Sequence, residues 1–240
     1  MSEHIGLSLM GLRFDFPYAG LGIASLIRNV NKLGFEEIEI PIITDELQMA
    51  TIAQTVKVTG VHVCAIHAEK NLMQTSPKSL NDKVEATVRF AAALDSNLIV
   101  LHPAPEWPSH DQIETLARGF AKYKLAIENT NSVAVEWVKI LSEYIECGIA
   151  LDISHARYLG QPIDYYFTAN VFHTHIRGYN SCERYTRIGP SDHEAIFELL
   201  YKEKQGLYKG ALMLEYPYIS LDDACDDKDV LTQLRKLVFE

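Results

Sequence analysis

The stretch GIALDISHA (residues 148–156) begins as an apolar strand, runs into Asp152 and carries a histidine three positions later. Asp152 or Ser154 could cap a helix that follows the strand, because both residue types are preferred at helix N-termini. Capping is a sufficient explanation for one such strand. It becomes insufficient if other strands of the chain also end in acids or histidines.

Short runs rich in Val, Ile and Leu recur along the chain and alternate with segments of helical periodicity, which is typical of repeated strand–helix units. Several helical segments end in Gly, as helix C-termini prefer. Eight units at a spacing of roughly 30 residues predict an α/β fold of the (β/α)8 TIM-barrel type. The expected strands cover residues 5–9, 36–41, 61–67, 97–102, 124–129, 148–152, 171–176 and 210–216.

An open, doubly wound sheet is the structural alternative to a barrel. No G-x-G-x-x-G or G-x-x-x-x-G-K-S/T motif follows any of the eight runs, so a nucleotide-binding sheet lacks its motif. No linker, low-complexity segment or block of charge divides the chain. We therefore expect residues 1–240 to form a single domain, since barrels of this length commonly do.

Composition narrows the class of protein. Hydrophobic residues make up 48% of the chain and charged residues 22%, which is ordinary for a globular protein. No apolar run reaches the roughly 18 residues that span a bilayer, and the N-terminus lacks the features of a signal peptide, so we expect a cytoplasmic protein without membrane contact. The four cysteines lie far apart without a C-x-x-C pair, which indicates reduced thiols. The net charge of −10 disfavours nucleic acid as a partner without excluding it.

The last residue of each run matters most, because the active site of a TIM barrel lies at the C-terminal ends of its strands. A single His or Glu there is usually a hydrogen-bonded rim residue. Several carboxylates in one small volume, however, repel one another unless a cation or protons neutralise them. We therefore predict a divalent metal, with Zn or Mn first and Co, Fe or Mg as alternatives. The residues that end six consecutive runs are His67, His102, Glu128, Asp152 (with His155 just beyond it), His175 and Glu215.

Loops near these ends offer candidates for substrate binding. Arg177, Arg184 and Arg187 follow the seventh run and could hold a phosphate or carboxylate as bidentate donors. The alternative is a solvated loop whose arginines pair with local acids. Trp107 follows the fourth run, where an indole could cover the apolar face of a sugar ring, exclude water or simply plug the barrel mouth.

Two more residues in or at the ends of the runs are of interest. Glu39 ends the second run, in EIEIP, and is a further candidate for substrate contact. His173 has the same strand parity as His175 and points inward if His175 does, although one layer deeper. We interpret His173 as a core histidine or as a support for the ligands, with ligation less expected.

As an ordered set, several strings resemble the xylose isomerase-like TIM barrels, a superfamily that joins sugar isomerases and epimerases to AP endonucleases of the endonuclease IV type. The resemblance covers nearly the whole chain from the second strand to the eighth. It is specific for the superfamily and not for the reaction. The strings are AIHAEKNL, VLHPAP, IENT, LDISHA, HIRG and MLEY.

The resemblance implies that Glu128, Asp152, His175 and Glu215 are the metal ligands of a sugar or sugar-phosphate isomerase or epimerase, whose substrate is a small polyhydroxy carbonyl compound. Glu128 and Glu215 would then be the acid/base pair that moves a proton through an enediolate, and His155 would contact substrate. True xylose isomerases keep a lysine shortly after the fifth-strand glutamate for a hydride shift. IENTNS has none, so proton transfer is favoured. A homo-oligomer is also implied by the resemblance.

The same resemblance implies a second function, a zinc-dependent AP endonuclease or another phosphoester hydrolase. His67, His102 and Glu128 match the first zinc site of that family, and Asp152, His175 and Glu215 match the second. His155 would begin the third site, which the family completes with a D-x-H motif. Here Glu183, Arg184 and Tyr185 stand in those places, and tyrosine is a poor replacement for histidine. In-line phosphodiester cleavage is therefore the less favoured reading.

A third reading is a non-catalytic relative that binds a metal or ligand. The complete set of four ligands counts against it, because a binding module has no need of two opposed glutamates. Substrate identity, stereochemistry, the species and number of metal ions, and the oligomeric state are left open by the sequence.

Overall fold

The computed structural model describes residues 4–12, 22–106, 109–181, 186–216 and 220–240. Five residues that the sequence analysis considered lie outside these ranges. They are Trp107, Cys182, Glu183, Arg184 and Tyr185.

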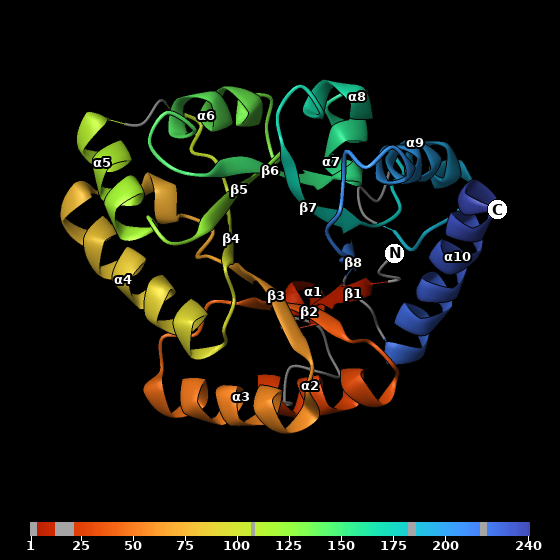
Figure 1. The fold of residues 1–240 in the computed structure, drawn as a ribbon, viewed down its shortest axis with the longest axis horizontal. Coiled ribbons are helices and arrows are strands. Elements are labelled where there is room, and N and C mark those ends of the chain that lie inside the picture. Colours follow the sequence, from red (N-terminus) through yellow and green to blue (C-terminus); the bar gives the residue numbers. More distant parts are fainter. Residues whose placement is uncertain (1–3, 13–21, 107–108, 182–185, 217–219) are drawn as a thin grey trace.

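Eight parallel strands pair in chain order, and β8 pairs again with β1, which closes the barrel. Figure 1 shows this ring of strands surrounded by the helices. The prediction of a single-domain (β/α)8 barrel is therefore confirmed. The strands are β1 (Ile5–Ser8), β2 (Glu37–Pro41), β3 (His62–His67), β4 (Leu98–Leu101), β5 (Lys124–Glu128), β6 (Cys147–Asp152), β7 (Val171–Ile176) and β8 (Leu212–Leu214).

Helices cover the outside of the barrel, and local capping sets where several of them begin. Asp45 starts α3 by accepting a hydrogen bond from the Gln48 amide at 2.8 Å, and Gly60 ends it in the left-handed region, at a φ of 72°. The helices are α1 (Leu9–Leu12), α2 (Ile23–Lys32), α3 (Glu46–Thr59), α4 (Pro77–Ala93), α5 (His110–Gly119), α6 (Ala134–Leu141), α7 (Ile153–Tyr158), α8 (Ile163–Tyr166), α9 (His193–Lys204) and α10 (Leu221–Phe239), with short 3-10 turns η2 (Leu72–Gln74) and η3 (Pro190–Asp192).

One helical segment is shorter than its periodicity suggested. The stretch VEWVKILSEYIECG (135–148) is one of the segments with helical periodicity, but α6 ends at Leu141. Cys147 belongs to β6, which begins one residue before the expected strand, because its backbone pairs with Leu125 of β5.

The buried apolar residues form two groups. The larger group fills the layer between the sheet and the helices. The smaller lies inside the barrel and contains Ala65, Leu98, Val100, Ala126 and Ala150. Side chains alternate along a strand, so each of these residues faces the same way as the residue two positions later. The strand-end residues of β3, β5 and β6 are therefore directed into the barrel, above a layer in which three side chains are alanine.

Two register shifts alter this layer. The β2–β3 ladder is irregular between Ile38 and Glu39, after which Glu39 pairs with Ala65. The β6–β7 ladder is irregular between Ile149 and Ala150, after which Ala150 pairs with His173. Irregularities of this kind redirect side chains. Each therefore places a long polar side chain, Glu39 or His173, on the strand beside an alanine.

The described part of the chain contains no helix that is both long and apolar enough to cross a membrane. Cys64, Cys147 and Cys225 are free thiols. Burial raises the pKa of the Cys147 thiol to about 12, so it stays protonated and unreactive at neutral pH.

Candidate metal centre

The predicted strand-end residues meet inside the C-terminal mouth of the barrel. His67, Glu128 and Asp152 are the last residues of β3, β5 and β6, and His175 is the penultimate residue of β7. All four side chains are buried. His102 directly follows β4, and Glu215 directly follows β8. Consecutive strands thus bring these six groups together, as the alternation of strand and helix predicted.

Glu128 lies at the centre of the group. Its Oε2 is 2.6 Å from Nε2 of His102 and 3.4 Å from Nε2 of His67. Its Oε1 is 3.3 Å from Nδ1 of His175 and 3.7 Å from Nε2 of His155. The two oxygens of one carboxylate therefore face four imidazole rings.

The two oxygens of Asp152 have different contacts. Oδ1 accepts hydrogen bonds from the Ser154 hydroxyl at 2.7 Å and the His155 amide at 2.9 Å, and so caps α7. Oδ2 contacts Nη2 of Arg177. Asn129 holds the backbone of Asp152 from β5, because its side chain accepts from the Asp152 amide at 2.7 Å and donates to its carbonyl at 3.0 Å. Capping and a site contact are thus combined in one residue.

Arg177 extends from β7 into the same group. Its Nη1 is 3.2 Å from Oε2 of Glu215, and its Nε donates to the Ser154 hydroxyl at 3.0 Å. The side chain is only 9% exposed, so the guanidinium belongs to the buried centre and not to a solvated loop. It lies between two acids, Asp152 and Glu215, where it can balance charge or meet an anionic group of a substrate.

Charges inside the centre shift the pKa values of its members. Burial alone would raise the pKa of Glu128, but His102 and the hydrogen bonds from His175 and His67 outweigh burial and hold that pKa well below the usual range. Burial favours the neutral ring of His67, yet Glu128 and the other acids raise the pKa of His67 to about 9. Protons on the imidazoles therefore balance the acids when no cation does so.

The geometry fits a divalent cation. Glu128, Asp152, His175 and Glu215 each offer one ligand atom, and these four atoms lie within 4.8 Å of one another. Oε2 of Glu215 is buried and lies 3.2 Å from both Nδ1 of His175 and Nη1 of Arg177, so a cation bound there would replace these contacts with coordination. Carboxylates and one imidazole, without thiolate, suit Zn or Mn.

A second group of three shares Glu128 with the first. His67, His102 and Glu128 also offer ligand atoms within 4.8 Å of one another. Nδ1 of His67 lies 3.1 Å from the Ala68 carbonyl, so a proton on Nδ1 leaves Nε2 free to face Glu128. The centre can therefore offer positions for more than one cation.

Glu39 does not lie where a substrate contact was expected. Its side chain is fully buried below the other residues, with Oε2 hydrogen-bonded to Nε2 of His175 at 3.0 Å. Nε2 of His173 lies 2.8 Å from the same oxygen. The difference arises because β2 continues to Pro41, which pairs with His67, whereas Glu39 pairs with Ala65 and so lies one layer below the strand-end residues.

Arg187 is also engaged elsewhere. Its guanidinium contacts three acids of α10, at 2.6 Å from Asp223, 3.1 Å from Asp227 and 3.3 Å from Asp226. These contacts match the alternative of a loop arginine paired with local acids, and they anchor the segment before η3 to α10. The structure thus does not bring Arg187 to the centre. Two other expected substrate contacts, Trp107 and Arg184, lie outside the described residues.

A cavity of about 400 Å³ opens above the centre. Its lining includes His67, His102, Glu128, His155, Arg177 and Glu215. It also includes residues that the sequence reading missed, namely Lys70, Asn71, Gln74 and Asn131. Their position was a usable signal, because Lys70 and Asn71 follow β3 and Asn131 follows β5, and the loops after barrel strands form the active site.

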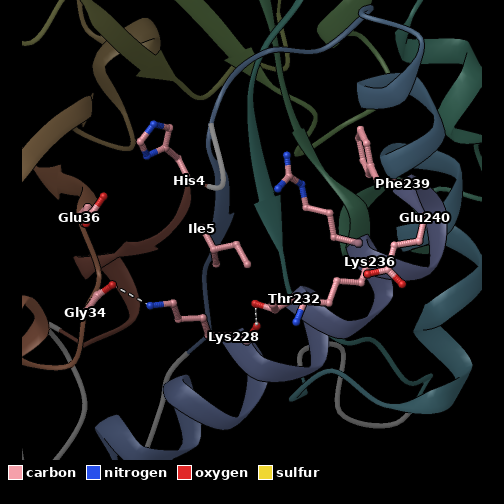
Figure 2. A pocket seen from close by; sticks show the side chains of 10 residues that line it. His4, Ile5, Gly34, Glu36, Lys228, Thr232, Lys236, Phe239 and Glu240 are labelled. Atoms are coloured by element: carbon pink, nitrogen blue, oxygen red, sulfur yellow. Dashed lines mark hydrogen bonds between the residues drawn. The ribbon is translucent and has the colours of Figure 1, made fainter. Parts of the chain in front are cut away.

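A larger cavity, of about 660 Å³, lies at the other end of the barrel, beside the start of β1 and the end of α10. Figure 2 shows its lining, in which Lys228 donates to the Gly34 carbonyl at 2.6 Å. His4, Glu36 and Phe239 also line it. The cavity shares no lining residue with the centre, so its size alone does not make it the candidate site.

Comparisons with known proteins agree with this architecture. The chain resembles the 3-keto-D-glucoside 4-epimerase YcjR from E. coli, with 15% identity, a TM-score of 0.67, and coverage of 98% of this chain and 100% of that one. D-allulose 3-epimerase from Methylomonas sp. aligns with 14% identity and a TM-score of 0.68 over 97% of each chain. The IolI protein, solved with a zinc atom, aligns with 16% identity and a TM-score of 0.73 over 99% of each chain. At these identities the likeness shows the fold alone.

The comparison with curated proteins returns no match. A family model described as "Xylose isomerase-like TIM barrel" matches residues 27–237, which is most of the chain. This match agrees with the closed barrel and with the ordered strand-end residues. The chain therefore belongs to the xylose isomerase-like TIM barrel family.

Proposed function

We propose that this protein is a divalent-metal-dependent isomerase or epimerase of a sugar or sugar phosphate. One observation carries the proposal: four buried residues from β5, β6, β7 and the end of β8 place their ligand atoms within 4.8 Å of one another. They are Glu128, Asp152, His175 and Glu215. The family membership supports the same reading.

The chemistry that fits this arrangement is proton transfer next to a carbonyl. A divalent cation bound by the four residues would polarise substrate oxygens and acidify the adjacent C–H bond. Glu128 is ionised at neutral pH because its pKa is held well below the usual range, so its carboxylate can accept that proton. In an epimerisation, Glu215, whose Oε2 is also buried in the centre, would in its protonated form give a proton to the opposite face of the same carbon; in an isomerisation, Glu128 would return its own proton to the neighbouring carbon.

Other lining residues would bind and orient the substrate. His155 lines the mouth cavity, with Nε2 3.7 Å from both Glu128 and Asp152 and 3.4 Å from Nη2 of Arg177, so its imidazole is placed to contact a substrate hydroxyl group. Arg177 is positioned for an anionic or carbonyl oxygen. The residues after Glu128 are Asn129, Thr130 and Asn131, so no lysine stands there for a hydride shift. Proton transfer is therefore the favoured route.

Proteins of similar fold support a proposal for the substrate class. They include enzymes named as 3-keto-D-glucoside 4-epimerase and L-ribulose 3-epimerase, and a D-allulose 3-epimerase was solved with D-allulose. We infer a ketose or keto-sugar substrate for this chain from the similarity to these enzymes and from the mouth cavity, which is lined by amides, imidazoles and charged groups.

The first test is the metal content per chain, measured by elemental analysis on protein purified without added metal or chelator. Wild type is compared with His67→Ala and with the control His62→Ala, which removes an exposed histidine at the opposite end of the barrel. We expect one ion per chain in all three proteins. Wild type should then interconvert ketose epimers or aldose–ketose pairs, followed by NMR of the sugar.

Two or more zinc ions in wild type, with one lost in His67→Ala, would contradict the proposal. That result would favour a phosphoester hydrolase, for which the group of His67, His102 and Glu128 is the specific support. A hydrolase should also bind abasic-site DNA with an affinity that falls steeply with salt. An isomerase should show no such affinity, as expected for a chain with a net charge of −10.

A further inference from the structure

We infer that Glu39 is a positioning residue for the metal centre, and that it acts through His175. The inference rests on the proposed function, because it assigns His175 as a ligand. Glu39 itself lies below the centre, fully buried, and lines none of the cavity at the mouth.

The contacts of His175 are divided between its two ring nitrogens. Nε2 points down to Oε2 of Glu39, at 3.0 Å. Nδ1 points up into the centre, at 3.3 Å from Oε1 of Glu128 and 3.2 Å from Oε2 of Glu215. A hydrogen bond from Nε2–H to a carboxylate leaves the lone pair of Nδ1 free, so Glu39 selects the tautomer that can bind a cation on the side of the acids.

Glu39 is itself held in place. Its Oε1 accepts a hydrogen bond from the Ser8 hydroxyl at 2.7 Å. The Ser8 oxygen in turn accepts from the Met10 amide at 3.3 Å. The orientation of His175 is therefore linked through the side chains of Glu39 and Ser8 to the backbone of α1, just beyond the end of β1.

The barrel interior provides room for this arrangement. Glu39 pairs with Ala65 across the β2–β3 ladder, and His173 pairs with Ala150 across the β6–β7 ladder. The His173 and His175 rings meet edge to face, with centroids 5.1 Å apart. Small neighbours thus let one carboxylate reach under His175, while His173 closes the space beside it.

Histidine ligands of metals generally donate their second N–H to a carboxylate or carbonyl, which fixes the ring and makes the ligand more basic. Loss of such a partner typically costs 10–100-fold in metal affinity. The Ser8–Glu39–His175 chain has this geometry. Its function would be to fix the orientation of the imidazole before a cation binds, so that binding costs less side-chain conformational entropy.

The test compares Glu39→Leu with Glu37→Leu, the same substitution two residues earlier on β2, where the glutamate contacts His62 at the opposite end of the barrel. Each protein is stripped of metal, and binding of Zn²⁺ alone is measured by competition with a chelator. We expect Glu39→Leu to bind about 10–100-fold more weakly than wild type. We expect Glu37→Leu to bind like wild type.

A conservative variant and a spectroscopic signature separate positioning from a merely structural effect. Glu39→Gln keeps an oxygen that can accept from Nε2–H, so it should recover most of the lost affinity. In zinc-loaded protein labelled with ¹⁵N-histidine, NMR should show His175 protonated on Nε2 in wild type and in Glu39→Gln. The Nε2 proton should exchange faster with solvent in Glu39→Leu.

Other results would overturn the inference. Zn²⁺ affinity that is unchanged in folded Glu39→Leu would show that the carboxylate does not support the ligand. Two ions in wild type, with one lost in His173→Phe, would show that Glu39, His173 and His175 bind a cation themselves. Failure of wild type to bind any metal would instead contradict the proposed function, so the two failures are distinguishable.

Discussion

The two ends of the barrel each hold a histidine–glutamate pair whose nitrogen and oxygen are 2.6 Å apart. At the C-terminal mouth the pair is His102 and Glu128, with side chains 16% and 2% exposed. At the opposite end it is His62 and Glu37, with side chains 63% and 12% exposed. The contact distance is the same, so it cannot explain why one end resembles an active site and the other does not.

The difference lies in burial and in the number of neighbours. Water and salt screen an exposed pair, which typically contributes 0–1 kcal/mol to stability, roughly the value of any surface ion pair. A buried carboxylate needs partners on every side, because an unpaired charge there is costly. Glu128 faces four imidazoles, whereas Glu37 faces His62 and, at 3.6 Å, His4. Convergence of several groups, and not the single contact, marks the functional end.

The largest expected effect comes from removing the charge at each end in turn. Glu128→Gln should lower turnover by about 10²–10⁴-fold, because it removes the proposed base and a metal ligand together. Glu37→Gln should leave turnover near that of wild type. Initial rates on the sugar substrate, with metal content measured in parallel, check both. Similar losses of turnover in the two variants would show that burial and the number of neighbouring groups do not distinguish the two ends of the barrel.

The second largest effect that we expect is a pH dependence of the stability of the metal-free protein. Folding raises the pKa of His67 from 6.5 to about 9, so between these values the folded state holds a proton that the unfolded chain releases. The stabilisation is complete below pH 6.5 and is lost as the pH rises through about 9. Thermal unfolding across this window should show a falling midpoint.

The variant His67→Gln should flatten that decline, whereas His62→Gln should not. Glu37 also raises the pKa of His62, but that ring is mostly exposed and its interaction is screened. A decline of equal slope in wild type and His67→Gln would contradict the assignment of the shift to the buried centre.

The smallest effect concerns the exposed pair itself. His62→Gln should change the free energy of unfolding by no more than about 1 kcal/mol, and the change should vanish at high salt. Urea denaturation at low and high ionic strength measures it. A loss of unfolding free energy that persists in high salt would show that the His62–Glu37 pair stabilises the fold more than its exposure suggests.

The strands and their endings could be read from the sequence because both depend on local pattern. Alternation along a strand fixes which side chains share a face, and the C-terminal ends of parallel strands meet at one mouth. Asp152 and Glu128 were therefore expected to end their strands, and they do. Helical periodicity extends over residues 135–148, but α6 ends at Leu141. Periodicity does not reveal that Cys147 pairs with β5 and begins a strand.

Residues whose position depends on strand register or on contacts with distant parts of the chain could not be placed in this way. Glu39 was expected to contact substrate because it ends the second run, but its depth in the barrel depends on its pairing with Ala65, after the register shift between β2 and β3. Arg187 was read from its loop, while its direction depends on the acids of α10, which lie far along the chain. Lys70 and Asn71 were missed although they follow β3, because a position after a strand does not by itself indicate which polar loop residues line the mouth cavity.

Asp152 limits how this protein can change during evolution. Its Oδ1 starts α7 while Oδ2 faces the centre, so two unrelated requirements act on one short side chain. Glutamate would reach a cation but is a poor cap, and histidine would lose the cap altogether. Among the described helices, none begins at Glu128, His175 or Glu215. We therefore expect a lineage that acquires a new cation or reaction to exchange those three positions more freely, while position 152 keeps its aspartate.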